Sequence, residues 1–207
     1  MPQLLLATNN PGKIAELRRL LEDCGWDLVT PADIRLAIDV EETGSTYEEN
    51  ARAKALAGMH ASGLVTLADD SGLEIEAIGG DPGVHSARFL GPRATYPDRF
   101  AEIQRRLAGL AASERVARFV AAIAIADPRT GAVHTVEGEV RGLIAREPRG
   151  SGGFGYDPIF WLPDRNLTMA ELPEHEKAII SHRARAAARA VPILKELLHD
   201  YQKPDPS

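Results

Sequence analysis

The sequence predicts a mixed α/β fold, because short apolar runs typical of buried strands alternate along the chain with longer amphipathic stretches typical of helices. Two long strand-like runs joined by a turn sequence lie in the middle of the chain, and a helical stretch follows near its end. With 207 residues, the chain can form one large domain or two small lobes. We expect one folded domain over residues 1–200 and a short, frayed polar tail over residues 201–207.

The N-terminal part of the chain predicts a strand, a turn and a helix in that order. Residues 4–7 form an apolar run typical of a strand that is buried on both faces, and residues 8–12 have the composition of a turn. In residues 13–21 the apolar positions fall on one helical face. A further short strand is expected at residues 28–29.

A second helix and two more strands are expected next. Thr46 and Glu49 have the spacing of a capping box, so a helix should occupy residues 46–63. Residues 64–68 predict a second buried strand that ends at a polar Asp-Asp-Ser-Gly sequence. Residues 73–78 alternate between apolar and polar positions, as a half-exposed strand does.

The second half of the chain predicts a helix, a β-hairpin, a glycine-rich loop and a C-terminal helical region. The expected ranges are 97–110 for the helix, 115–126 and 132–144 for the hairpin strands, 149–158 for the loop and 174–199 for the helical region. Within the last region, Pro192 should kink or break the helix, because proline lacks a backbone N–H and its ring clashes with the preceding turn.

The composition argues against several functional classes. The net charge of −6 disfavours a general nucleic-acid binder, which usually carries a basic excess. Cys24 is the only cysteine, so an intrachain disulfide and a cysteine-based zinc site are excluded, and we expect this side chain to pack as a small hydrophobe. No apolar run approaches the length of a membrane span, and the first residues do not resemble a signal peptide. We therefore expect a cytoplasmic protein without a membrane partner.

Residues 8–13, Thr-Asn-Asn-Pro-Gly-Lys, predict either a phosphate site or an ordinary helix start. A strand leads into a tight turn and then into a helix N-terminus, where free backbone N–H groups and the helix dipole attract anions. Lys13 lies in the first helical turn, where its charge opposes the dipole unless an anion lies between them. The sequence lacks the spacing of a Walker A loop. The alternative is a capped helix with a solvated lysine.

Two acidic sets predict a site for a divalent cation. Glu41 and Glu42 precede a predicted helix, and Asp69 and Asp70 follow a predicted buried strand. Ligands of α/β sheets gather at the carboxyl ends of strands, and Mg²⁺ takes carboxylate oxygens together with water and substrate phosphates. Adjacent aspartates are costly there unless a cation offsets their charge. The alternatives are a solvated pair of glutamates and an Asp-Ser-Gly turn.

Two further segments have the composition of a nucleotide site. In the glycine-rich loop, Phe154 and Tyr156 offer flat faces for a base, and Asp157 can accept hydrogen bonds from a base or a sugar. The alternative is a tight loop whose aromatic side chains cap the core. Residues 177–185 gather lysine, histidine and arginine, which suit phosphate or a carbonyl edge. The alternative there is an exposed basic face of a terminal helix.

Together these segments resemble the inosine triphosphate pyrophosphatase family, which acts on non-canonical purine nucleoside triphosphates, and the match covers most of the chain. The residues that carry the resemblance are 7–13, 41–44 with 49–51, 68–73, 79–88, 152–160 and 181–183. Six motifs in one order are far more specific than any single motif. Asn10 and Pro11 vary the first motif, while no catalytic position is lost.

The resemblance implies a reaction, a cofactor and an architecture. The reaction is hydrolysis of ITP, dITP or XTP to the nucleoside monophosphate and pyrophosphate, with water attacking the α-phosphorus. Glu41 and Asp70 would hold Mg²⁺, and Asp70 would also be the general base. The implied fold is a long twisted mixed sheet flanked by helices, in two lobes with a central substrate cleft, and a homodimer.

The resemblance also implies the substrate-binding residues. His182 and Arg183 would read the purine edge, where a 6-oxo group distinguishes hypoxanthine and xanthine from adenine. By position, the substrate-binding residues would be Thr8, Asn9, Asn10, Pro11, Gly12, Lys13, Ser71, Phe154, Gly155, Tyr156, Asp157, Lys177, His182 and Arg183.

Three alternatives to this function stay open at the level of the sequence. A pyrophosphatase with another base preference, such as a modified pyrimidine, is the nearest of them. A nucleotide-binding regulator without catalysis is the second, and the intact acidic set argues against it. A structural or RNA-binding protein is the third, which the net charge of −6 disfavours.

Overall fold

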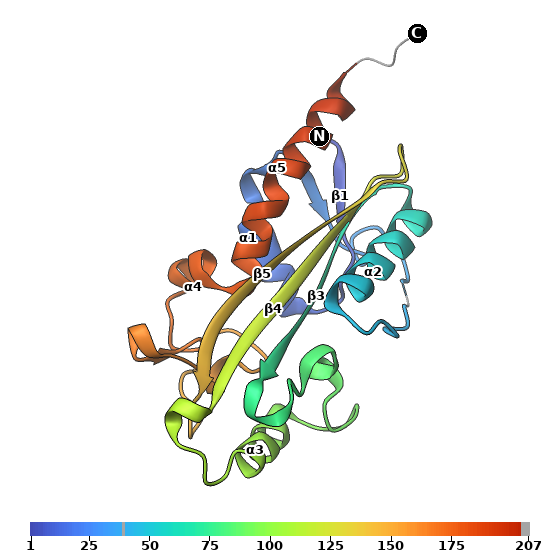
Figure 1. Ribbon diagram of the computed structural model, residues 1–207. Helices are drawn as coiled ribbons and strands as arrows, with labels where there is room; N and C mark the ends of the chain where they lie inside the picture. Colours follow the sequence, from blue (N-terminus) through green and yellow to red (C-terminus); the bar gives the residue numbers. More distant parts are fainter. Residues whose placement is uncertain (39, 204–207) are drawn as a thin grey trace. The chain divides into compact units, whose positions relative to one another are not determined.

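The computed structural model describes residues 1–38 and 40–203, and it confirms the mixed α/β fold (Figure 1). The strands are β1 (Gln3–Leu6), β2 (Asp27–Val29), β3 (Val65–Ile75), β4 (Val116–Ala126), β5 (Val133–Ile144), β6 (Phe160–Leu162) and β7 (Leu167–Thr168). The α-helices are α1 (Pro11–Leu20), α2 (Tyr47–Ser62), α3 (Tyr96–Arg106), α4 (Glu174–Ile180) and α5 (His182–Gln202).

The strands form a mixed seven-stranded sheet in the order β2-β1-β3-β4-β5-β6-β7. Strand β1 pairs in parallel with both β2 and β3, whereas β6 pairs antiparallel with both β5 and β7. The predicted hairpin turn joins β4 to β5, and in it the Gly131 N–H donates to the Asp127 carbonyl at 2.8 Å. The parallel strands are connected through helices, as the βαβ pattern of the N-terminal part requires.

The chain divides into two compact units. Unit 1 comprises residues 1–70, 121–138 and 183 onward, and unit 2 comprises residues 71–120 and 139–182. The long strands β3, β4 and β5 each contribute residues to both units.

Unit 1 has helices on both faces of its strands (Figure 1). Alternate side chains of β1 and β3 pack with α1 and α5 in one apolar cluster, which includes Leu4, Leu17, Leu67 and Leu194. Helix α2 approaches the opposite face, where a Cβ on Gly58 would lie 2.8 Å from the Thr66 side chain. The small residues of α2 therefore allow this helix to lie close to the sheet.

Unit 2 has its own apolar core around aromatic side chains. Phe119 and Phe160 lie 4.4 Å apart between ring centroids, and helix α3 adds Phe100 and Ile103 to the cluster. Thr95 and Asp98 form the capping box that starts α3. In unit 1, Thr46 caps α2 as predicted, because its Oγ1 accepts from the Glu49 N–H, but the Glu49 carboxylate accepts from the Ser45 N–H instead of the Thr46 N–H that a capping box uses.

The prediction that a strand ends at Asp69 and Asp70 is wrong, because β3 continues through both residues to Ile75. The sequence predicted two strands separated by a polar turn. The structure keeps one strand because both carboxylates have cationic partners from helices distant in sequence. A buried strand can contain such residues when their charges are compensated.

The C-terminal helical region breaks at Ser181 and not at Pro192. Ser181 is buried in an extended conformation with φ −65° and ψ 157°, and it separates α4 from α5. Pro192 lies inside α5, whose buried alanines and Leu194 belong to the apolar cluster of unit 1. This packing outweighs the loss of one helical hydrogen bond.

Helix α5 also continues into the predicted tail. The ring of Tyr201 packs edge-on against Trp26 at 5.4 Å, and its hydroxyl donates to Asp127 Oδ1 at 2.9 Å. Residues 204–207, the rest of the predicted tail, lie outside the described residues. None of the helices in the described part of the chain combines the length and the apolar character needed to cross a membrane.

Candidate active site

Asp69 and Asp70 are adjacent in β3 and contact different helices. Side chains of successive strand residues point to opposite faces of a sheet. Asp69 accordingly meets Lys13 of α1 and Arg183 of α5, whereas Asp70 meets Lys54 of α2. The two carboxylates therefore form separate clusters, and both clusters consist of unit 1 residues.

Asp69 is the centre of a buried ion cluster. Its carboxylate lies 2.6 Å from Lys13 Nζ and 3.2 Å from Arg183 Nε, and Arg183 Nη1 also lies 2.5 Å from the Glu16 carboxylate. Burial alone would raise the pKa of Asp69, but Arg183 and Lys13 hold this pKa well below its usual range. Arg183 is 2% exposed, so the predicted alternative of an exposed basic face is wrong for this residue.

Asp70 has both carboxylate oxygens in hydrogen bonds from helix α2. Lys54 Nζ donates to Oδ1 at 2.7 Å, and Asn50 Nδ2 donates to Oδ2 at 3.2 Å. Burial raises the pKa of Asp70 above its usual value, although Lys54 and Lys13 act in the opposite direction. A buried carboxylate with a raised pKa is a candidate general base.

The acidic segment before α2, which contains Glu41 and Glu42, is linked to Asp70 through Glu42. Lys54 Nζ lies 3.0 Å from Glu42 Oε1, so one ammonium group bridges the Glu42 and Asp70 carboxylates. Glu41 is exposed, and its backbone carbonyl accepts a hydrogen bond from the Thr43 N–H.

This set of oxygens suits a hard divalent cation. Among residues 1–38 and 40–203, no three His, Cys, Asp or Glu side chains are grouped to hold a metal ion. Mg²⁺ nevertheless needs only one or two carboxylates when substrate phosphates supply further ligands. The ammonium of Lys54 already lies between two carboxylates, which shows that this position favours a cation.

The predicted phosphate loop begins α1 as expected, with its polar groups bonded to one another. Asn10 caps the helix, and its Oδ1 accepts hydrogen bonds from the Gly12 and Lys13 N–H groups. Thr8 Oγ1 accepts from the Asn10 N–H at 3.2 Å. Asn9, Asn10 and Pro11 are exposed, so the loop itself is open to solvent.

The glycine-rich loop in unit 2 is organised by Asp157. This buried carboxylate accepts from the Phe154 N–H at 2.9 Å and lies 2.6 Å from Lys177 Nζ. A Cβ on Gly153, which has φ +70°, would lie 2.0 Å from Asp157 Oδ2, so this position requires glycine. Lys177 Nζ also lies 5.3 Å from the centroid of the half-buried Phe154 ring.

Tyr156 and His182 are both buried against aromatic rings of unit 2. Tyr156 is 4% exposed, packs edge-on against Tyr96 and donates its hydroxyl to the Ser86 carbonyl at 2.9 Å. It therefore fits the alternative of an aromatic side chain in the core. The His182 imidazole stacks on Phe119 at 4.7 Å. Ser71 follows Asp70 in β3 and is half-buried.

Sequence reasoning missed Lys54 and assigned no role to Asn50, although Asn50 lies in the motif at residues 49–51; both residues contact Asp70. They lie four residues apart on α2, which places them on one helical face. A local signal was available, because Asn50 and Lys54, with Arg52 between them, interrupt an alanine-rich stretch. The sequence predicted that Glu41 and Asp70 together hold the cation. In the structure, Glu42 is the glutamate whose carboxylate is linked to Asp70, through Lys54.

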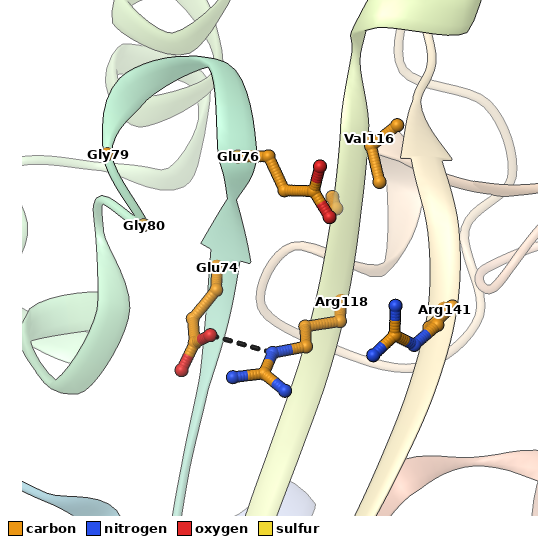
Figure 2. Close-up of a pocket in the computed structure, with 8 residues that line it drawn as sticks. Glu74, Glu76, Gly79, Gly80, Val116, Arg118 and Arg141 are labelled. Atoms are coloured by element: carbon orange, nitrogen blue, oxygen red, sulfur yellow. Dashed lines mark hydrogen bonds and ion pairs between the residues drawn. The ribbon is translucent and has the colours of Figure 1, made fainter.

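A separate polar cavity of about 420 Å³ lies in unit 2 (Figure 2). Its lining includes Glu74 and Arg118, which pair at 2.8 Å, and Arg141, which pairs with Glu139 outside the lining. None of the predicted site residues lines it. Its arginines are paired with glutamates, so its charge does not resemble that of a triphosphate site.

Comparison with known proteins identifies what this chain is similar to. Residues 4–193 match the model of the Ham1 family. A protein named dITP/XTP pyrophosphatase from Desulforamulus reducens is 46% identical to this chain, and the alignment covers 94% of this chain and 96% of that protein. A protein of the same name from Thermus thermophilus is 47% identical, and the alignment covers 99% of this chain and 94% of that protein.

A solved structure of a HAM1 protein from Coxiella burnetii has the same fold. It superposes with a TM-score of 0.85 at 41% sequence identity, and the alignment covers 95% of this chain and 100% of that one. The comparisons confirm the family that the six motifs predicted.

Proposed function

This chain belongs to the Ham1 family, and we propose that it hydrolyses ITP, dITP and XTP to the nucleoside monophosphate and pyrophosphate. The observation that supports this reaction most is the buried Asp70 carboxylate, which is held by Lys54 and Asn50 and has a raised pKa. Its relatives named dITP/XTP pyrophosphatase support the choice of substrate. Removal of such nucleotides from the pool would be the biological role.

The cofactor in this proposal is Mg²⁺, held by Asp70 and Glu41. Glu42 is a further candidate, because Lys54 already joins its carboxylate to that of Asp70. Bound there with the substrate phosphates, the cation would offset the negative charge that develops in the transition state. Asp70 would orient a water molecule and accept its proton.

Substrate binding is proposed to involve three segments. The residues at positions 8–13 would contact the triphosphate, and Lys13 would supply a positive charge. The base and sugar site would be formed by Lys177 and by the loop residues Phe154, Gly155, Tyr156 and Asp157. Ser71 would contact the substrate beside Asp70. Because Tyr156 is buried, Phe154 is the better candidate for stacking on a base.

Base selection is proposed to depend on the 6-oxo group of hypoxanthine and xanthine. His182 and Arg183 are the candidate donors, and adenine presents an amine where they would donate. A site built around hydrogen bonds rejects a mismatched base because its buried partners are left unpaired.

A substrate panel tests this proposal. With Mg²⁺ present, we expect kcat/KM for ITP, dITP and XTP to exceed that for ATP by about two orders of magnitude or more. The nucleoside monophosphate and pyrophosphate, separated by ion-exchange chromatography, give the rates, and the same assay without Mg²⁺ is the control. Equal rates on GTP, ATP and ITP would contradict the proposed selectivity.

The family resemblance also supports a homodimer in the cytoplasm, with a free nucleotide and not a nucleic acid as the partner. The net charge of −6 is consistent with this choice, since a few positive side chains suffice for one triphosphate. Sedimentation analysis of the purified protein would distinguish the dimer from a monomer.

A further inference from the structure

Helix α2 links Asp70 to the acidic segment through two separate side chains. Lys54 bridges Asp70 and Glu42 through its ammonium group. Asn50, one helical turn earlier, donates from Nδ2 to Asp70 Oδ2 at 3.2 Å and accepts at Oδ1 from the Gly44 N–H at 2.9 Å. The first link carries a positive charge, and the second is neutral.

The contacts of Asn50 fix the orientation of its amide. Only the observed orientation gives the Asp70 carboxylate a donor and the Gly44 N–H an acceptor. Asn50 is 1% exposed, so loss of either bond would leave a buried polar group unsatisfied. The side chain is therefore held at both ends.

The acidic segment approaches Asn50 closely because residue 44 is a glycine. A Cβ at Gly44 would lie 2.6 Å from Asn50 Oδ1 and 2.8 Å from Glu49 Cβ. Both distances are shorter than van der Waals contact, so a larger residue would displace the segment or the amide. Gly44 and Asn50 thus form one matched contact.

We propose that Asn50 is a positioning residue, which keeps the Asp70 carboxylate and the segment of Glu41 and Glu42 in register when a divalent cation binds. This inference rests on the proposed metal-dependent function. A cation at these carboxylates would repel the ammonium of Lys54, which is bound to the same oxygens. The neutral amide of Asn50 has no such conflict, so its bonds can persist beside the cation.

The role expected of Asn50 is that of an outer partner to metal ligands. Such partners orient the ligating carboxylates, and their removal lowers metal affinity or activity by about 10- to 100-fold. A residue that serves only the core would instead change stability and leave metal affinity unchanged. These two outcomes can be measured separately.

The test compares two variants that break the contact from opposite sides. Asn50→Leu keeps a similar volume but removes both bonds, and Gly44→Ala keeps the amide but forces it away from the segment. The matched control is Glu49→Gln, because Glu49 accepts from the Ser45 N–H at 2.7 Å and so contacts the same segment without reaching Asp70. Titration calorimetry with Mn²⁺, without nucleotide, measures metal affinity, and thermal unfolding measures stability.

We expect both variants to weaken Mn²⁺ binding by about tenfold or more, and the Mg²⁺ concentration for half-maximal ITP hydrolysis should rise in proportion. Glu49→Gln should bind Mn²⁺ as the wild type does. The double variant should lose no more affinity than the worse single variant, since both substitutions break one link. If Asn50→Leu does not fold, Gly44→Ala gives the answer.

Wild-type affinity for Mn²⁺ in folded Asn50→Leu or Gly44→Ala would overturn the inference and leave the proposed function intact. If the wild type binds no Mn²⁺ and hydrolyses ITP equally well in EDTA, the metal site itself fails and the inference fails with it. The two failures are therefore distinguishable.

Discussion

Asp70→Asn should lower kcat for ITP hydrolysis by about two to four orders of magnitude, because the amide can neither accept the proton of water nor hold a cation as a carboxylate does. Asparagine has nearly the same shape, so the packing of β3 should be preserved. Steady-state kinetics with ITP and Mg²⁺ measures the effect.

The stability of Asp70→Asn should change by no more than about 1 kcal/mol. Burial raises the pKa of Asp70, so the folded state gains little from this charge, and Lys54 retains Glu42 as an anionic partner. Denaturant unfolding provides this control. Activity within about tenfold of the wild type, in a protein of unchanged stability, would contradict the catalytic role of Asp70.

Asp69→Asn should show its main effect on stability, with a loss of about 3 to 5 kcal/mol in the free energy of unfolding. The substitution removes the carboxylate that contacts both Lys13 and Arg183 and leaves the buried Arg183 guanidinium with Glu16. A buried charge that loses its partner is strongly destabilising. Urea unfolding monitored by circular dichroism measures the loss.

Acid titration of stability gives a second readout for Asp69. Because its pKa is lowered in the folded state, the ionised carboxylate stabilises the fold above the unfolded-state pKa of about 4, and this contribution is lost as the pH falls below that value. The wild type should therefore lose its advantage over Asp69→Asn at acid pH. An equal difference in stability at pH 7 and at acid pH would contradict the ion cluster.

The adjacent pair of aspartates shows where local sequence patterns are insufficient. The apolar run at residues 64–68 predicted a buried strand correctly, but the two aspartates indicated its end. Their partners come from α1, α2 and α5, which are distant in sequence, and only these contacts allow the strand to continue. Alternation along β3 then places the two carboxylates in different clusters, Asp69 with Lys13 and Arg183 and Asp70 with Lys54.

Most helices were predictable because their signals are local. Thr46 caps α2, and the hairpin between β4 and β5 follows from its turn sequence. Pro192 does not break the helix, because the packing of α5 against β1 and β3 within unit 1 outweighs this local preference. The break at Ser181 has a local signal that sequence reasoning did not use, because serine is a preferred residue directly before a helix and α5 begins at His182.

The candidate site could be predicted in its parts but not in its internal contacts. The motifs identified Asp70, Asp157 and Lys177, and the structure shows the last two paired at 2.6 Å. They did not indicate that Asp70 is held by Asn50 and Lys54. Such contacts join segments through the fold, and a single sequence records them only as spacing on a helix.

Hydrolysis of ITP in water enriched in oxygen-18, with Mg²⁺ present, tests the proposed reaction most directly. Water that attacks the α-phosphorus places the label in the nucleoside monophosphate and releases unlabelled pyrophosphate. We therefore expect labelled IMP by mass spectrometry. Label in pyrophosphate, or release of IDP with labelled orthophosphate, would contradict the proposed reaction.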